Sequence, residues 1–399
     1  MDAPRRAWLA LTRPQLGWLT LACGLSLTAW GIAAIGTASP SHADKQIQWF
    51  GVSAVAFLVA LLPHPRWIGR FAWPAFLGCL ALLVLLSLGV LPRAVTPVIN
   101  GARSWYLLGP LQYQPSETTK VFAILAVAWF LRYRASHRTL RGLILPFVIT
   151  LVPVVLILRQ PDLGMALLFI PALIAMLVAA GARLRHLGAL AGIAALFAAL
   201  NVGLILFGPD SAQILRPHQV SRIRSMAALA AGDESGNSDA GFQQSTAMRL
   251  AGAGGLTGAG DELSREMLDA LKLPEPFNDM IFAVVLNRWG LLGGAGMLTL
   301  FAGMVAGCLG VAARSRDPVG RLACVGFAAS LATQAFIVTG MTVGLLPITG
   351  LTLPFVSYGG SSLLTNFLML GLVVNFGAAE PQRLARPSFE FDGRQAAFQ

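Results

Sequence analysis

Ten apolar stretches divide this chain, and no other feature of the sequence limits its fold as strongly. Hydrophobic residues make up 56% of its 399 residues and charged residues only 12%, which excludes a water-soluble domain of this size. A helix needs roughly 20 apolar residues to span a bilayer, or fewer where its ends are buried in protein. We therefore predict an all-α polytopic membrane protein with ten transmembrane helices, near residues 17–36, 48–63, 71–91, 116–131, 143–158, 163–181, 187–207, 279–305, 319–341 and 361–379.

Lys and Arg sort between the two sides when the connections are assigned alternately. The four short loops of one side hold only Lys45, Arg93, Arg103 and Arg159. The other side holds most of the remaining arginines, at positions 5, 6, 13, 66, 70, 132, 134, 138, 141, 183, 185, 314, 316, 321, 383, 386 and 394. Cytoplasmic loops carry the excess of Lys and Arg, and long loops barely affect this rule. Both termini are therefore predicted to be cytoplasmic, in a multi-pass protein of the cytoplasmic membrane.

This orientation makes one membrane domain of residues 1–399, with residues 208–278 as a large extracytoplasmic loop before the eighth helix. The net charge of +11 is explained by arginines beside anionic lipid headgroups, so we predict no nucleic-acid partner. The four cysteines lie within apolar runs without paired spacing, and the five histidines are scattered. The sequence therefore indicates neither a disulfide framework nor a metal cluster.

The first outward polar segment contains Arg103 and Trp105 and continues into the start of the fourth helix. Glu117 suits a first helical turn, where the helix dipole favours a carboxylate. Lys120 lies one turn deeper, in an apolar span. Two interpretations stay open for it: an ion pair with Glu117, or a functional intramembrane cation. Trp105 fits an interfacial aromatic belt as well as a site.

The next two polar segments each place an acid at a helix start. Asp162 follows Gln160-Pro161, and Asp279 follows a Pro-Glu-Pro-Phe-Asn run. Either acid suits a helix cap or first turn, but both also lie at the predicted outer boundary. Farther along the eighth helix, Arg288 is a cation within the span and requires a partner.

The fourth outward segment, residues 346–362, mixes apolar residues with Gly, Pro and hydroxyl residues, including Ser357 and Ser361. This composition is typical of a non-helical loop buried within a membrane protein. Its Gly-Gly-Ser-Ser end stands at a helix N-terminus, which can bind an anion such as phosphate.

Taken together, these segments resemble the SEDS family (shape, elongation, division and sporulation), the group of RodA, FtsW and SpoVE. The matching stretches occur in family order over roughly residues 90–376. They are Asn100-Gly-Ala-Arg-Ser-Trp105, Gln114-Pro-Ser-Glu117 with Lys120, Gln160-Pro-Asp-Leu-Gly164, Leu215-Arg-Pro-His-Gln219 with Arg222, Gly241-Phe-Gln243, Gly254-Gly-Leu-Thr-Gly258, Pro274-Glu275 with Asp279 and Ile281-Phe-Ala-Val284, Gly290-Leu-Leu-Gly293 and Pro347 to Ser362.

The resemblance implies a peptidoglycan glycosyltransferase that polymerises glycan strands from lipid II at the outer face of the membrane, beside a class B penicillin-binding protein. It implies Asp279 as the catalytic residue. Candidate substrate-binding residues within the matching stretches are Arg103, Trp105, Glu117, Lys120, Asp162, Gln219, Arg222, Ser357 and Ser361. The chain also departs from the family pattern. It has Phe277-Asn278 for His-Thr, Asn287-Arg288 for a Glu pair and Val338 for Asn. The Gln-Ser of the long loop is displaced, with Thr246-Ala247 at the ungapped positions.

The expected reaction explains this choice of residues. An acceptor sugar hydroxyl attacks an anomeric carbon, and a carboxylate removes its proton. A diphosphate leaves as an anion, so it needs cations or N–H groups rather than a second acid. We expect Asp279 to be the base, with Arg103 and Lys120 on the diphosphate. A divalent cation could share that charge, but no cofactor is required by the sequence. A lipid flippase and a non-catalytic scaffold for cell-wall assembly are the alternative functions.

Overall fold

The computed structural model describes residues 15–98, 103–109, 111–134, 136–209, 217–230 and 239–378, and each of the ten predicted stretches overlaps a helix. Those helices are α2 (Gly17–Ala38), α3 (Pro40–Leu61), α4 (Pro65–Leu88), α5 (Pro115–Leu131), α6 (Leu140–Arg159), α7 (Leu163–Ala179), α8 (Leu184–Phe207), α12 (Ile281–Arg314), α13 (Pro318–Thr342) and α14 (Gly360–Ala378). Seven of them, α2, α4, α6, α8, α12, α13 and α14, are long and apolar enough to cross a membrane. The chain is an integral membrane protein of α-helices.

Two helices differ in length from their apolar stretches. α3 begins at Pro40, eight residues before the apolar run, because a proline suits the first helical position and the helix continues through polar residues. α12 extends over 34 residues, beyond the predicted end at 305. It contains a break at Gly290, where φ is 68° and ψ is −168°.

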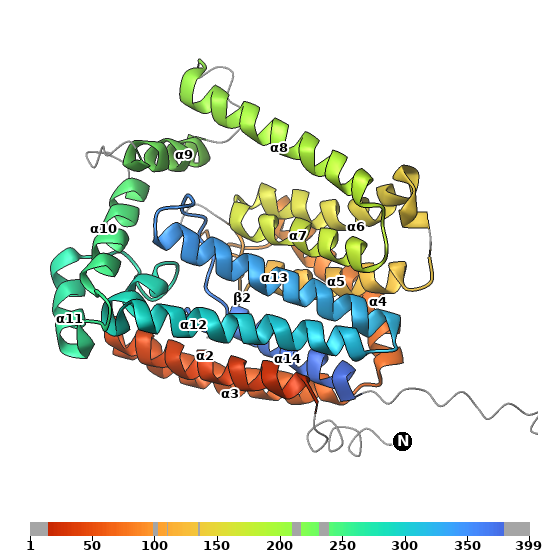
Figure 1. Cartoon of the computed structure of the whole chain (residues 1–399), viewed down its shortest axis with the longest axis horizontal. Coiled ribbons are helices and arrows are strands. Elements are labelled where there is room, and N and C mark those ends of the chain that lie inside the picture. Colours follow the sequence, from red (N-terminus) through yellow and green to blue (C-terminus); the bar gives the residue numbers. More distant parts are fainter. Residues whose placement is uncertain are drawn as a thin grey trace, which may run out of the picture.

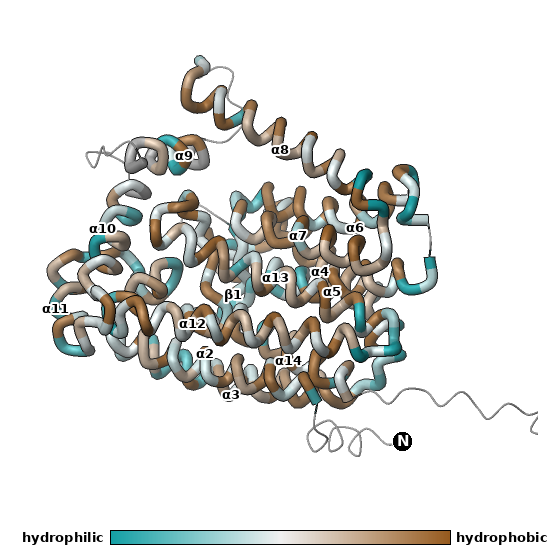
Figure 2. Tube along the Cα trace, in the orientation of Figure 1, coloured by the Kyte–Doolittle hydropathy of each residue, from teal (hydrophilic) through white to brown (hydrophobic). Residues whose placement is uncertain are grey.

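The helices pack side by side into a bundle whose interior is formed by α5 and α14 (Figure 1). α14 lies against α2 and α3, α12 against α2 and α13, and α4 against α5. α8 is the exception, because it extends away from the bundle and buries only Leu187 and Ile205 (Figure 1). Its exposed surface is apolar, as lipid contact requires (Figure 2).

The predicted outer loop is largely helical. It contains α9 (Pro217–Ala230), α10 (Asp239–Ala253) and α11 (Gly260–Leu271), which lie at one end of the bundle (Figure 1). Other short elements are η1 (Ser136–Arg138) and a hairpin of β1 (Tyr106–Leu108) and β2 (Leu111–Tyr113). The hairpin was not predicted. Its strands are antiparallel, with Tyr106 opposite Tyr113.

At the break in α12, the glycine-rich turn between α10 and α11 packs against the helix and accepts hydrogen bonds from its free N–H groups. The N–H of Leu291 donates to the Gly255 carbonyl at 2.9 Å, and the N–H of Leu292 to the Leu256 carbonyl at 3.1 Å. A Cβ on Gly290 would lie 2.4 Å from the Gly258 nitrogen, so only glycine allows this approach. The two glycine motifs of the sequence therefore join the turn between α10 and α11 to α12.

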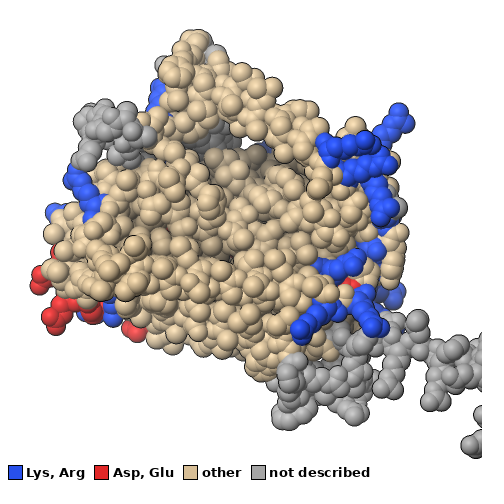
Figure 3. All heavy atoms as spheres, in the orientation of Figure 1, with Lys and Arg blue, Asp and Glu red and all other residues tan. Residues whose placement is uncertain are grey.

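The charges separate along the bundle. α2 begins and α14 ends at the same end, because Gly17 lies against Val374. On the face seen in Figure 3, Lys and Arg gather at that end and Asp and Glu gather around α11 at the other. The predictions for the two termini concern residues 1–14 and 379–399, which are outside the described residues.

Candidate active site

Asp279 lies in the tight loop that joins α11 to α12. Its side chain is partly buried, and Oδ2 faces the backbone at Gly350, where an added Cβ would lie 3.9 Å away. Burial raises the pKa of this carboxyl to about 6, and the negative charge of Glu275 adds to that shift. The positive charge of Arg222 and the N–H of Asp279 itself oppose it. No side chain among the described residues forms a hydrogen bond or ion pair with this carboxylate.

Ser357 holds the Asp279 loop against the segment before α14. Its hydroxyl donates to the Asn278 carbonyl at 2.6 Å and accepts from the Leu353 N–H at 2.7 Å. The side chain amide of Gln46, on α3, donates to the Ser357 carbonyl at 3.1 Å. The predicted buried, non-helical loop thus supports Asp279, and the Ser357 hydroxyl is engaged with backbone groups.

Arg222, on α9, is the cation whose charge acts on the Asp279 carboxyl, and it contacts the segment that faces Asp279. Its Nη1 donates to the Ile348 carbonyl at 3.0 Å, two residues before Gly350. The same segment touches the start of α7, where a Cβ on Gly164 would lie 2.9 Å from the Thr349 carbonyl oxygen. Arg222 therefore lies at a segment that has Asp279 on one side and the start of α7 on the other.

Asp162 caps α7 at that start. Its Oδ1 accepts from the Met165 N–H at 3.0 Å, and its Oδ2 accepts from the side chain amide of Gln114 at 3.1 Å. Burial raises its pKa to about 6, and the nearby charge of Glu117 adds to the shift. The helix-cap interpretation of Asp162 is therefore correct, and the positive charge of Arg222 lowers its pKa in opposition to Glu117.

Lys120 and Glu117 form a buried ion pair, the first of the two interpretations left open by the sequence. Lys120 Nζ lies 3.1 Å from Glu117 Oε2, and their side chains are 1% and 3% exposed. Nζ also donates to Gln334 Oε1 at 3.1 Å, and the Gln334 amide donates to the Thr352 carbonyl at 2.8 Å. The pair thus links α5 to α13 and to the loop before α14.

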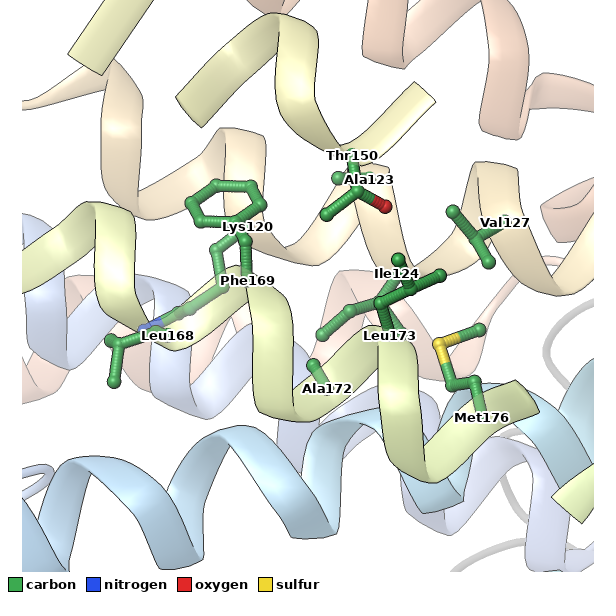
Figure 4. Close-up of a pocket in the computed structure, with 10 residues that line it drawn as sticks. All are labelled: Lys120, Ala123, Ile124, Val127, Thr150, Leu168, Phe169, Ala172, Leu173 and Met176. Atoms are coloured by element: carbon green, nitrogen blue, oxygen red, sulfur yellow. The ribbon is translucent and has the colours of Figure 1, made fainter. Parts of the chain in front are cut away.

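The cleft beside Lys120 is mostly apolar (Figure 4), and its lining contains no residue of the Asp279 loop. The Lys120 stem and Thr150 border it, and its other walls come from α5 and α7, with Ala123, Ile124, Val127, Leu168, Phe169, Ala172, Leu173 and Met176. Nothing in this lining can bind a diphosphate, because its one cation is already paired with Glu117.

Arg103 gathers backbone carbonyls at the end of α4. Its Nη1 donates to Gly89 at 2.9 Å, its Nη2 to Leu91 and its Nε to Thr96 at 3.1 Å. Cations are favoured at a helix C-terminus, where carbonyls lack partners. This arrangement anchors the loop after α4, while the predicted contact with diphosphate remains a prediction. Trp105 is partly exposed beside it.

Two further predicted residues have different outcomes. The Ser361 hydroxyl is buried, donates to the Gln112 carbonyl at 2.8 Å and accepts from the Gln114 N–H at 3.1 Å. It therefore fastens the hairpin to α14. The side chain of Gln219 is outside the described part of the chain.

Arg288 has found its partner in Asp261, on α11. Its Nη1 lies 2.9 Å from Asp261 Oδ1 and also donates to the Ala33 carbonyl and to Thr37, on α2. Sequence reasoning missed Asp261, Gln46 and Gln334. The sequence could have indicated the last two, since a single amide beside or within an apolar run needs hydrogen-bond partners.

No group of three or more His, Cys, Asp or Glu side chains gathers to hold a metal ion in the part of the chain that the structure describes. The site offers a carboxylate with a raised pKa, held in its loop through Ser357, and a guanidinium that donates to the neighbouring segment at Ile348.

Comparisons with known proteins show the family to which this chain belongs. The family model for the FtsW, RodA and SpoVE cell cycle proteins matches residues 16–381. Stage V sporulation protein E of Bacillus subtilis is 34% identical over 338 residues, 84% of this chain and 86% of that protein. The probable peptidoglycan glycosyltransferase FtsW of Coxiella burnetii is 31% identical over 372 residues, 90% of this chain and 94% of that protein.

Two solved structures share the fold. A chain of a peptidoglycan synthase complex that coordinates polymerization and crosslinking superposes with a TM-score of 0.73 and 29% identity, over 90% of this chain and 96% of the other. The rod shape determining protein RodA of Thermus thermophilus gives a TM-score of 0.62 and 27% identity, over 90% of this chain and 95% of RodA. The family prediction is therefore confirmed, and this chain belongs to the FtsW, RodA and SpoVE family, the SEDS family that its motifs indicate.

Proposed function

We propose that this protein is a peptidoglycan glycosyltransferase that polymerises glycan strands from lipid II, with Asp279 as the general base. One observation carries the assignment of the base: Asp279 is a partly buried acid without an ion-pair partner among the described residues, and its pKa is raised to about 6. A base of this pKa is mostly ionised at neutral pH and still accepts a proton well. General-base catalysis typically contributes a factor of about 10²–10⁴.

Arg222 is the cation that best suits the departing diphosphate, because it lies at the segment that faces Asp279. Lys120 is less suited, since Glu117 already neutralises it inside the bundle. We assign Asp162, Trp105 and Gln219 to substrate binding at the edge of the site, here called the rim. Glu117, Lys120, Ser357 and Ser361 act by holding that rim and the Asp279 loop in place. No step of this proposal requires a metal ion.

The orientation follows from charge. We propose that all ten helices cross the cytoplasmic membrane as one domain, with both termini and the arginine-rich end in the cytoplasm. The end that carries α9, α10, α11 and Asp279 is then extracytoplasmic, where the sugar of lipid II is presented. A class B penicillin-binding protein would crosslink the product. The family assignment and the complex with TM-score 0.73 support this partner.

The test is polymerisation by the purified protein, with and without a class B penicillin-binding protein, using labelled lipid II and gel analysis. Wild type should give polymer and Asp279→Asn should give none while keeping its fold. Asp269→Asn, the same change at an exposed position on α11, serves as the control and should remain active. Polymer from Asp279→Asn would remove the base assignment. If wild type moves lipid II across a bilayer but makes no polymer, the flippase is favoured. If it does neither, the scaffold is favoured.

A further inference from the structure

Three aromatic rings gather beside the Asp279 loop: His42, Phe277 and Tyr358, here called the aromatic cluster. The His42 and Phe277 rings are stacked, with centroids 4.0 Å apart and planes at 19°. Tyr358 stands edge-on to both, at 4.8 Å from His42 and 6.0 Å from Phe277. All three side chains are partly exposed, and Phe277 and Tyr358 also pack against the hydrophobic core, so the cluster lies where the core meets the surface.

The cluster is fixed to the loop that carries the acid. Phe277 is two residues before Asp279, and its carbonyl accepts from the Tyr358 N–H at 2.9 Å. Ser357, next to Tyr358, donates to the Asn278 carbonyl, as described above. His42 comes from α3, one turn before Gln46, which donates to the carbonyl of Ser357. The rings and Asp279 are therefore held in one rigid unit drawn from three parts of the chain.

Polar groups border the rings. The Asn278 amide donates to Glu275 Oε2 at 2.8 Å, and this pair is exposed. A pyranose ring has an apolar C–H face and a rim of hydroxyl groups. The stack uses one face of His42 and one face of Phe277, so each ring keeps its other face outside the stack. Such a face, bordered by an amide and a carboxylate, is complementary to a pyranose, because the ring covers the apolar C–H face and the polar groups bond the hydroxyls.

We propose that the aromatic cluster is a sugar-stacking subsite, which holds a hexosamine ring of the glycan next to the sugar that reacts at Asp279. The identity of the ligand rests on the proposed function. In this subsite Phe277 stacks on the sugar and Asn278 bonds its hydroxyls. These are two positions where the sequence departs from the family pattern.

The simpler interpretation is an aromatic belt at the membrane interface. The chain offers a pair for comparison, Trp67 and Phe71 on α4, whose rings are stacked at 5.9 Å and 23°. Those two are 51% and 58% exposed, and Arg70 lies over Trp67 at 5.6 Å. That pair belongs to the arginine-rich end and lies along a single helix, as a belt does. The aromatic cluster instead joins three chain segments around the acid loop.

The subsite is tested by binding, without turnover. In the Asp279→Asn background, a soluble tetrasaccharide of alternating N-acetylglucosamine and N-acetylmuramic acid is titrated by calorimetry. Phe277→Ala should weaken its Kd about tenfold, the size expected for loss of an aromatic contact. Phe277→Tyr keeps a ring and should bind like the parent. Phe71→Ala removes a matched ring from the other end and should also leave the Kd unchanged.

Equal affinity in Phe277→Ala and its parent overturns the subsite, and so does a parent that does not bind the tetrasaccharide. Melting curves of each variant establish that it is folded, and Phe277→Tyr controls for damage to the loop. The result is independent of the base assignment. If Asp279→Asn still polymerised lipid II, that assignment would fall while the Kd series would still decide the subsite.

Discussion

Two arrangements of acid and base lie in this bundle, and they use their charges in opposite ways. Glu117 and Lys120 are in direct contact at 3.1 Å and are almost wholly buried. Asp279 and Arg222 both lie against the segment before α14, but Arg222 donates to the Ile348 carbonyl there and Asp279 has no direct partner among the described side chains. A buried charge in direct contact with its counter-ion holds structure together. An acid whose cation stands apart keeps a raised pKa and remains able to accept a proton.

The largest effect is expected from breaking the buried pair. Lys120→Met leaves Glu117 buried without a counter-ion, which costs about 3–5 kcal/mol of folding stability. Thermal melting in detergent should show a large fall in Tm. Adding Glu117→Gln removes the unpaired charge and should restore most of the loss.

The opposite outcome would reassign Lys120. If Lys120→Met melted like wild type and yet made no polymer, its charge would act on substrate, as the sequence first suggested. The double variant keeps this test clear, because it separates the loss of a charge from the loss of a fold.

The helices and the acids at their ends could be predicted, because both depend on local sequence. Long apolar runs must be helical in lipid, where the backbone has no other source of hydrogen bonds. A proline and an acid mark a helix start, as at Pro115 with Glu117. The arginine pattern also predicts an outer position for Asp279, and that orientation stays a prediction.

Contacts between distant residues could not be predicted in this way. The role of Arg103 depends on where the chain turns after α4, since its donors reach carbonyls of three residues in that turn. Asp261 lies on a separate helix, α11, so nothing local connects it to Arg288 within α12. A local sequence pattern shows that a charge needs a partner, while the fold decides which partner it has.

An intermediate effect is expected from pH, through the acid that stands alone. Because its pKa is raised to about 6, Asp279 is increasingly protonated below that pH, and a protonated carboxyl cannot act as a base. kcat/KM for lipid II should therefore fall about tenfold for each pH unit below about 6 and level off above it.

Asp162 provides the control for this profile, because its pKa is also raised to about 6. In Asp162→Asn, the acid limb should remain near pH 6 if Asp279 is the base. If the acid limb disappears in Asp162→Asn, the titration belongs to Asp162. The acid without a direct partner, Asp279, would then not be the group that controls activity.

The smallest effect is expected where an ion pair is only partly buried. Arg288 and Asp261 are 22% and 35% exposed, and Arg265 also contacts Asp261 at 2.8 Å. Arg288→Met therefore leaves Asp261 with a second cation, and exposed pairs contribute about 0.2–1 kcal/mol. The Tm of Arg288→Met should stay much closer to wild type than that of Lys120→Met. A loss as large as that of Lys120→Met would mean that Arg288 stabilises the break in α12 through its carbonyl and Thr37 contacts, so that burial alone would not rank the two pairs.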